Sequence, residues 1–284
     1  MFPILFNIGN FQIRTYSVIL LITFVVGIFL LRRTLKRRTL INPDIVIDIA
    51  FWVILGVVIG SRLAYVFMHW PEYSASPERI FKIWEGGAVY YGGFILAFVF
   101  GGAYLLIKKI PIIPMLDAIA PIVALGEGIG RLGCFFNGCC YGKATDSFLG
   151  IIYPYDSLCY HYPANYSYGT HVWPTPLFQV LGGLLLFLFL TILPRFTKLR
   201  NGQLFGAFLV GFGGLRLLVN FFRFYEDSIN LWTNNWIAIA LITFGIALLL
   251  IFGLTQKQLP SLEEIANERK RLEAATHKNK KKRA

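Results

Sequence analysis

SINLWTNNWIAIALITFGIALLLIFGLTQ spans residues 228–256 and contains no Asp, Glu, Lys or Arg. A helix needs roughly 17–25 mainly apolar residues to cross the hydrocarbon core of a bilayer, so this stretch is long enough. Its apolar residues are continuous rather than alternating, which favours a helix over the strands of a membrane barrel. The stretch therefore predicts a transmembrane helix near the end of the chain.

Six further segments share this apolar character. The whole sequence is 56% hydrophobic and only 15% charged, whereas soluble domains are about half apolar and about a quarter charged. Segments 15–31, 86–107 and 172–194 carry no acidic or basic residue, and segments 45–69, 115–135 and 204–222 are interrupted only by isolated charges. We therefore predict an all-α integral membrane protein with seven transmembrane helices.

The uneven distribution of basic residues predicts the orientation of these helices. The net charge is +12, and most of the 27 Lys and Arg residues follow the first, third, fifth and seventh predicted helices. With seven spans these four regions face one side, which the positive-inside rule makes cytoplasmic. We therefore expect the N-terminus outside and the C-terminus in the cytoplasm. Because the basic residues follow this membrane pattern, we do not expect a nucleic-acid partner.

The predicted helices divide the chain into a membrane domain, residues 1–255, and a basic cytoplasmic tail, residues 256–284. We expect the tail to be solvated and close to anionic lipid headgroups. The first residues lack a basic region and a small-residue cleavage site, so no removable signal peptide is expected. The longest outward loop, 136–173, is rich in tyrosine. An interfacial cap and a platform for an incoming peptide or lipid headgroup are both compatible with this composition.

Charged side chains inside the predicted helices mark a candidate site, because they are costly within a membrane. They include Arg62, Glu127, Arg131 and Arg216. Glu127 and Arg131 are four residues apart with the acid first, the favourable order for a helical ion pair, whereas Arg216 has no acid within a turn. This excess of arginine indicates an anionic ligand, and a guanidinium group suits phosphate. The charges therefore predict an outward-leaning site for a phosphate-bearing amphiphile, such as a phospholipid.

Glycines precede each of the three arginines, and we expect most of them to allow close packing of helices. They are Gly56 and Gly60, Gly126 and Gly130, and Gly213 and Gly214. The segment GEGIG (126–130) does not indicate a dinucleotide-binding loop, because it lies inside a predicted membrane helix and no strand precedes it.

The four cysteines lie near or on the outward side, where disulfides persist. Cys159 has Cys139 or Cys140 as a plausible partner, and the sequence does not choose between them. Adjacent cysteines are poorly spaced as metal ligands, so we expect no metal site.

The segment GRLGCFFNGCCYG (130–142) resembles the signature of the bacterial prolipoprotein diacylglyceryl transferases. Further similar segments follow the order of that family over roughly residues 10–255. They are Tyr16, GSRLAYV (60–66), WEGGAVYYGG (84–93) and GQLFGAFLVGFGGLRLLVNFFR (202–223).

The resemblance implies an enzyme of the bacterial cytoplasmic membrane that needs no cofactor. A lipobox cysteine thiolate of a preprolipoprotein would attack the diacylglyceryl carbon of phosphatidylglycerol, and glycerol phosphate would leave as a thioether forms. By position, Arg131 would hold the lipid phosphate and Arg216 would gate the site or stabilise the leaving group. Asn137 would bind the headgroup and Gly142 would permit a tight turn. Tyr16, Arg62 and Arg223 complete the implied lipid-binding residues.

The chain departs from the family pattern at several site positions. Tyr91 stands where well-known members have a histidine, which makes Tyr91 the candidate base. Cys134 and Cys139 replace an asparagine and a glutamate, and Asn220 replaces another glutamate. These departures leave a second hypothesis open, a diverged member that binds anionic phospholipid or assists another membrane protein without catalysis. A small-anion transporter is disfavoured because the helices show no repeat in corresponding halves.

Overall fold

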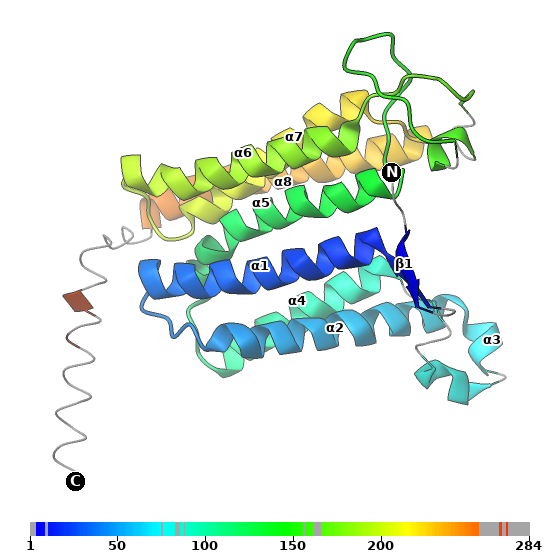
Figure 1. Cartoon of the computed structure of the whole chain (residues 1–284). Coiled ribbons are helices and arrows are strands. Elements are labelled where there is room, and N and C mark those ends of the chain that lie inside the picture. The colour runs from blue at the N-terminus through cyan, green and yellow to red at the C-terminus, as the bar shows by residue number, and fades with distance from the viewer. Residues whose placement is uncertain are drawn as a thin grey trace. The chain divides into compact units, whose positions relative to one another are not determined.

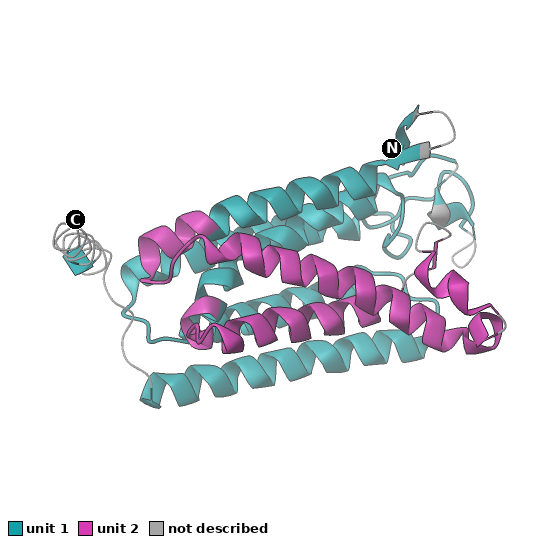
Figure 2. Cartoon of the chain, turned by 90° about the horizontal axis from the view of Figure 1, so that it is seen from below, with its two compact units in different colours: residues 1–31, 116–284 teal, residues 32–115 magenta. Residues whose placement is uncertain are grey.

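The computed structural model describes residues 4–8, 11–74, 76–82, 86–87, 89–155, 157–161, 166–255, 267–268 and 271. Nearly all of the predicted tail, 256–284, lies outside these residues. The chain forms two compact units (Figure 2), one of residues 1–31 and 116–284 and one of residues 32–115.

The larger unit is built from long helices (Figure 1). A short antiparallel hairpin, β1 (Ile4–Ile8) and β2 (Phe11–Arg14), leads into α1 (Thr15–Arg38), whose last residues belong to the smaller unit. The other long helices are α5 (Ile112–Phe136), α6 (Thr175–Phe196), α7 (Gln203–Phe222) and α8 (Ser228–Thr255). Among the described residues of the loop 136–173, Leu158–Tyr160 form the 3-10 turn η3.

The smaller unit consists mainly of two helices, α2 (Ile45–Met68) and α4 (Tyr90–Ile107), that pack against each other. Between them the chain forms the short helix α3 (Trp70–Ser74) and the 3-10 helix η1 (Pro77–Phe81). The hydropathy pattern does not predict these two short elements, because each is too short for apolar residues to repeat along one face.

Each of the seven predicted apolar segments coincides with one long helix. Six of the helices, α1, α2, α5, α6, α7 and α8, are long and apolar enough to cross a membrane. The remaining apolar helix is shorter, with Gly92–Ile107 as its apolar part. The prediction of an all-α membrane protein is confirmed at this level. The hairpin β1–β2 was not predicted, because its residues read only as a mildly apolar lead.

Glycines bring neighbouring helices into close contact within each unit. A Cβ atom on Gly60 would lie 2.6 Å from Leu96 Cβ and still closer to Gly92 O, so α2 and α4 touch backbone to backbone. A Cβ atom on Gly245 of α8 would lie 2.8 Å from Gly206 O of α7. The packing role expected for Gly56, Gly60 and Gly213 is confirmed. Gly130 is different, since an added Cβ there meets no described atom within 4 Å.

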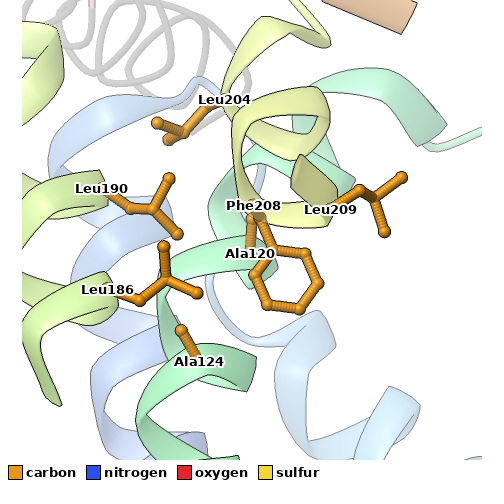
Figure 3. Packing of buried hydrophobic residues seen from close by; sticks show 7 residues of the cluster. All are labelled: Ala120, Ala124, Leu186, Leu190, Leu204, Phe208 and Leu209. Carbon is orange, nitrogen blue, oxygen red and sulfur yellow. The ribbon is translucent and has the colours of Figure 1, made fainter. Parts of the chain in front are cut away.

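The apolar core of the larger unit lies where α5, α6 and α7 meet (Figure 3). Leu190 and Ala120 are fully buried, and Phe208 fills the space beside them. A single acid anchors one end of this core. The carboxylate oxygens of Asp117 on α5 accept hydrogen bonds from Gly202 N at 2.6 Å and Phe205 N at 2.8 Å, which caps the first turn of α7.

Candidate active site

The signature segment forms the end of α5 and the turn that follows it. Gly138 has φ +68° and Cys140 has φ +61°, so the chain reverses direction immediately after the helix. The Thr175 hydroxyl donates a 2.6 Å hydrogen bond to Cys140 O, which fixes this turn to the start of α6. The turn places the cysteines beside the last two turns of α5, where Arg131 lies.

Arg131 forms the ion pair that the sequence predicts. Its Nη2 atom lies 3.5 Å from Oε2 of Glu127, and the two side chains are 17% and 37% exposed. At 3.5 Å the pair is loose, and Glu127 also lines a narrow recess together with Gln179 and Arg216. Glu127 therefore pairs with Arg131 and lines the same recess as Arg216.

Arg216 combines one firm contact with one unsatisfied donor. Its Nη2 atom donates a 2.6 Å hydrogen bond to Oδ1 of Asn234 on α8. Its Nε atom is buried and has no hydrogen-bond partner in the described part of the chain. A buried donor without a partner costs free energy, so this group is suited to an acceptor brought by a ligand.

Asn220 lies one turn beyond Arg216, and both its nitrogen and its oxygen form hydrogen bonds. Its amide nitrogen donates to Asn235 Oδ1 at 2.7 Å, and its oxygen accepts from the Tyr225 hydroxyl at 2.7 Å. Together with Arg216 and Asn234 these contacts form a polar seam between α7 and α8. The seam holds Arg216 in place without an acid on its own helix.

Gly142 lies between two other chain segments and does not form the expected tight turn. Its N–H donates to Trp173 O at 2.9 Å, and it bridges to Arg223 on its other side. An added Cβ would lie 2.5 Å from Trp173 Cβ and 2.6 Å from Phe222 O. The left-handed residues of the turn after α5 are Gly138 and Cys140, and Gly142 allows the close approach of the neighbouring backbone segments.

The other expected lipid-binding residues of the larger unit lie close to this junction. The Tyr16 ring packs over Gly133, two residues beyond Arg131. The Asn137 side chain is partly exposed and makes no hydrogen bond to any residue that the structure describes. Arg223 follows the end of α7, with its guanidinium 5.3 Å from the centre of the Tyr225 ring. All three surround the end of α5.

Arg62, in the smaller unit, has a different environment from the one expected. Its guanidinium donates to five backbone carbonyls of residues 79–87 at 2.5–3.3 Å and lies over the Tyr73 ring. A guanidinium has only five N–H groups, so this arrangement leaves none for a phosphate. The geometry therefore argues against the expected lipid contact and makes Arg62 the anchor of η1 and of the described residues that follow it.

The four cysteines are free thiols, so the expected pairing of Cys159 with Cys139 or Cys140 is not present. Cys134, Cys139 and Cys140 place their sulfur atoms within 4.8 Å of one another, despite the adjacency of two of them. Hydrogen bonds from Cys134 and Cys139, with Arg223 and Arg131 nearby, lower the pKa of Cys140. Cys159 is fully buried, and desolvation raises its pKa to about 11.

The outward loop has a core of its own. Tyr153 and Tyr141 are buried together with Val172 and Cys159, and Phe224 stacks on Tyr141. Tyr155 and Tyr168, by contrast, are 64% and 63% exposed. The tyrosine-rich loop thus contains buried aromatic residues, which form its core, as well as exposed ones.

Tyr91 belongs to α4 in the smaller unit, but its side chain lies outside the described residues. Sequence reasoning missed Asp117, Gln179 and the Asn234–Asn235 pair. A single Asp at a helix end and two Asn residues on an apolar helix carried weak signals, since their partners are remote in the sequence.

Fold and site together define a multi-pass helical membrane protein whose polar site is built on arginine. The family model for prolipoprotein diacylglyceryl transferase matches residues 3–251, and the chain belongs to this family. It is 33% identical to the phosphatidylglycerol–prolipoprotein diacylglyceryl transferase of Geobacter sulfurreducens, over 93% of this chain and 96% of the relative. It is 31% identical to that of Dechloromonas aromatica, over 90% and 97% of the two chains.

Proposed function

We propose that this protein transfers the diacylglyceryl group of phosphatidylglycerol to the lipobox cysteine of preprolipoproteins. Family membership over almost the whole chain supports this, as do the names of relatives that match at similar length. The observation that carries the proposal is the grouping of two arginines near one acid. Arg131 is held by Glu127, and Glu127 shares its recess with Arg216, whose buried Nε lacks a partner in the described structure.

The reaction forms a carbon–sulfur bond and breaks a carbon–oxygen bond. The lipobox thiol loses its proton, the thiolate attacks the glyceryl carbon next to the phosphate ester, and glycerol phosphate leaves with the electron pair of the broken bond. The thiolate is the nucleophilic form, so the step needs a proton acceptor. Negative charge develops on the phosphate oxygen, and fixed cationic donors in a water-poor site stabilise it strongly.

Arg131 and Arg216 supply those donors in the proposed mechanism. The loose contact of Arg131 with Glu127 leaves several of its N–H groups available for a phosphate oxygen. Arg216, positioned by Asn234, presents its Nε–H to the leaving oxygen. Asn137, Tyr16 and Arg223 lie around the end of α5 and bind the headgroup, while Gly142 keeps their backbone segments close.

Tyr91 is our proposed proton acceptor. The ordinary pKa of tyrosine, about 10, makes it a weak base unless a cation stabilises the phenolate. Retained turnover in Tyr91→Phe would remove Tyr91 from this role. Loss of turnover with unchanged phosphatidylglycerol binding would support it.

We further propose that α4 completes a set of seven spans, with the N-terminus outside and the basic tail in the cytoplasm. The match between the predicted segments and the helices supports seven spans, and the basic residues after α1, α4, α6 and α8 support the orientation. The site then lies at the outward side of the cytoplasmic membrane, where secreted preproteins emerge.

Complementation of a bacterial strain depleted of its own diacylglyceryl transferase tests the proposal. The wild-type chain should restore growth and lipoprotein maturation. Arg131→Ala should fail, and Arg131→Lys should restore little, because lysine lacks the planar fork of donors. Arg33→Ala is the matched control, since Arg33 is exposed and lies near the end of α1 opposite to Tyr16. Equal amounts of each variant in the membrane are required. Growth supported by Arg131→Ala would overturn the proposal.

A further inference from the structure

We infer that Cys134, Cys139 and Cys140 form a binding site for one thiophilic metal ion, Zn(II) or Cu(I). Their sulfur atoms all lie within 4.8 Å of one another in the absence of any disulfide. Around a tetrahedral zinc ion with bonds of about 2.3 Å, three sulfur atoms lie about 3.8 Å apart. A small inward movement of each side chain therefore closes the site on a metal.

The backbone makes this arrangement possible despite the adjacent cysteines. In a regular helix or strand, neighbouring side chains diverge, which is why Cys139 and Cys140 looked poorly spaced. Here Gly138 and Cys140 both adopt left-handed conformations, and Cys139 N donates to Cys134 O at 3.1 Å. The turn therefore folds back on the end of α5 and directs three thiols to one point.

Two cationic side chains and one buried hydroxyl lie near the three sulfur atoms. Arg131 and Arg223 act electrostatically on Cys140 and offset the negative charge that three thiolates bring. Tyr153 is 1% exposed, its hydroxyl has no partner among the described residues, and it is close enough to the same cysteines to be influenced by their charge. A hydroxyl so placed is suited to donate a hydrogen bond to a metal-bound sulfur.

Access and ligand type favour a soft ion. Cys134 is 9% exposed, whereas Cys139 and Cys140 are partly exposed, so an ion can enter from the side of the turn. Thiolates select Zn(II) and Cu(I) over hard cations. The bound ion would hold the turn against α5 and so fix the position of Arg131.

The first experiment measures the metal bound by the full-length protein in detergent. After treatment with a reductant and a chelator, the protein is titrated with Zn(II), with Cu(I) and, as a spectroscopic probe, with Co(II). We expect one equivalent to bind and Co(II) to show a thiolate charge-transfer band. Cys134→Ser, Cys139→Ser and Cys140→Ser should each weaken binding by more than about 100-fold, beyond the effect of losing an outer contact. Cys159→Ser, the matched control, should bind like the wild type.

A second measurement uses only the wild-type protein, so its result does not depend on whether the cysteine variants fold. The metal-loaded and chelated forms are alkylated, and peptides are identified by mass spectrometry. Protection of Cys134, Cys139 and Cys140 by either Zn(II) or Cu(I) supports the site. Equal alkylation with and without both metals would overturn it, as would a disulfide between two of the three in freshly purified protein. The site can fail while the transferase activity stands, because neither readout depends on turnover.

Discussion

Three arginines within apolar helices of this chain serve different purposes. Arg131 is paired loosely with Glu127, Arg216 keeps a buried Nε without a partner in the described structure, and Arg62 donates all of its N–H groups to backbone carbonyls. The cost of a charge in a membrane helix marks all three alike, and helical spacing adds only the ion pair of Arg131 with Glu127. Only the hydrogen-bond partners separate an arginine that binds a ligand from one that holds a loop.

Gly142→Ala should destabilise the protein and abolish activity. The new Cβ would lie 2.5 Å from Trp173 Cβ and 2.6 Å from Phe222 O, and neither backbone can move without breaking its pairing. Overpacking of this kind costs about 1–3 kcal/mol. Thermal unfolding in detergent measures the effect. Gly130→Ala is the control, because an added Cβ there meets no described atom within 4 Å. Equal stability of the two variants would contradict the assignment.

Cys159 should be inert toward alkylation at pH values where ordinary thiols react. Burial raises its pKa to about 11, so the folded state keeps the thiol protonated. This difference in pKa favours the folded state at pH values below the ordinary thiol pKa. Its contribution to the free energy of unfolding is lost as the pH rises from about 9 through about 11. Iodoacetamide labelling read by peptide mass spectrometry should show Cys159 reacting only in that upper window. Rapid labelling at pH 8 would show that the loop core is open.

At the scale of elements, Arg62 should act as the anchor that holds η1 to α2. Arg62→Met keeps the length of the side chain but leaves the carbonyls of Arg79, Ile80 and Lys82 without their donor. Hydrogen bonds to charged groups contribute about 1.5–3 kcal/mol each, so the segment 76–87 should open and become cleavable. Limited proteolysis of proteoliposomes followed by mass spectrometry tests this. Unchanged proteolysis with lost phosphatidylglycerol binding would instead restore Arg62 to the lipid site.

The long helices could be predicted from sequence because each carries its own signal, a run of apolar residues. The start of α8 matches its predicted start, and α2 and α7 differ from their predicted bounds by one residue. The hairpin β1–β2 and the elements α3 and η1 carry no such signal, since each is too short to contain a long apolar run. The same limit applies to the cap that Asp117 provides for α7, whose partners lie far away in the sequence.

The candidate site was predictable in its chemistry but not in its connections. The cost of placing a charge inside a membrane identified Arg131, Glu127 and Arg216 as candidates. Helical spacing then predicted the ion pair between Glu127 and Arg131. The contact of Arg216 with Asn234 and the grouping of three cysteine sulfurs depend on helix packing and on a left-handed turn. Spacing rules for regular structure argued against the cysteine cluster because they do not describe such a turn.

At the scale of the whole molecule, the proposed orientation places the two ends of the chain on opposite sides of the membrane. A fluorescent reporter that folds only in the cytoplasm should be active when fused after the tail. A reporter that works only outside should be active when inserted between α7 and α8, in residues 223–227. The basic residues after α1, α4, α6 and α8 are the reason for this expectation. Activity of both reporters at the same position would contradict the topology.

The central claim is that an arginine site in a membrane protein transfers a diacylglyceryl group to a thiol. Its most direct test uses the purified chain in phosphatidylglycerol nanodiscs with a lipobox peptide, and mass spectrometry for the thioether product. The wild type should form product, and Arg131→Ala should be slower by at least about 100-fold, the effect of removing a donor to a developing negative charge. Phosphatidylglycerol binding without any thioether product from the wild type would contradict the account.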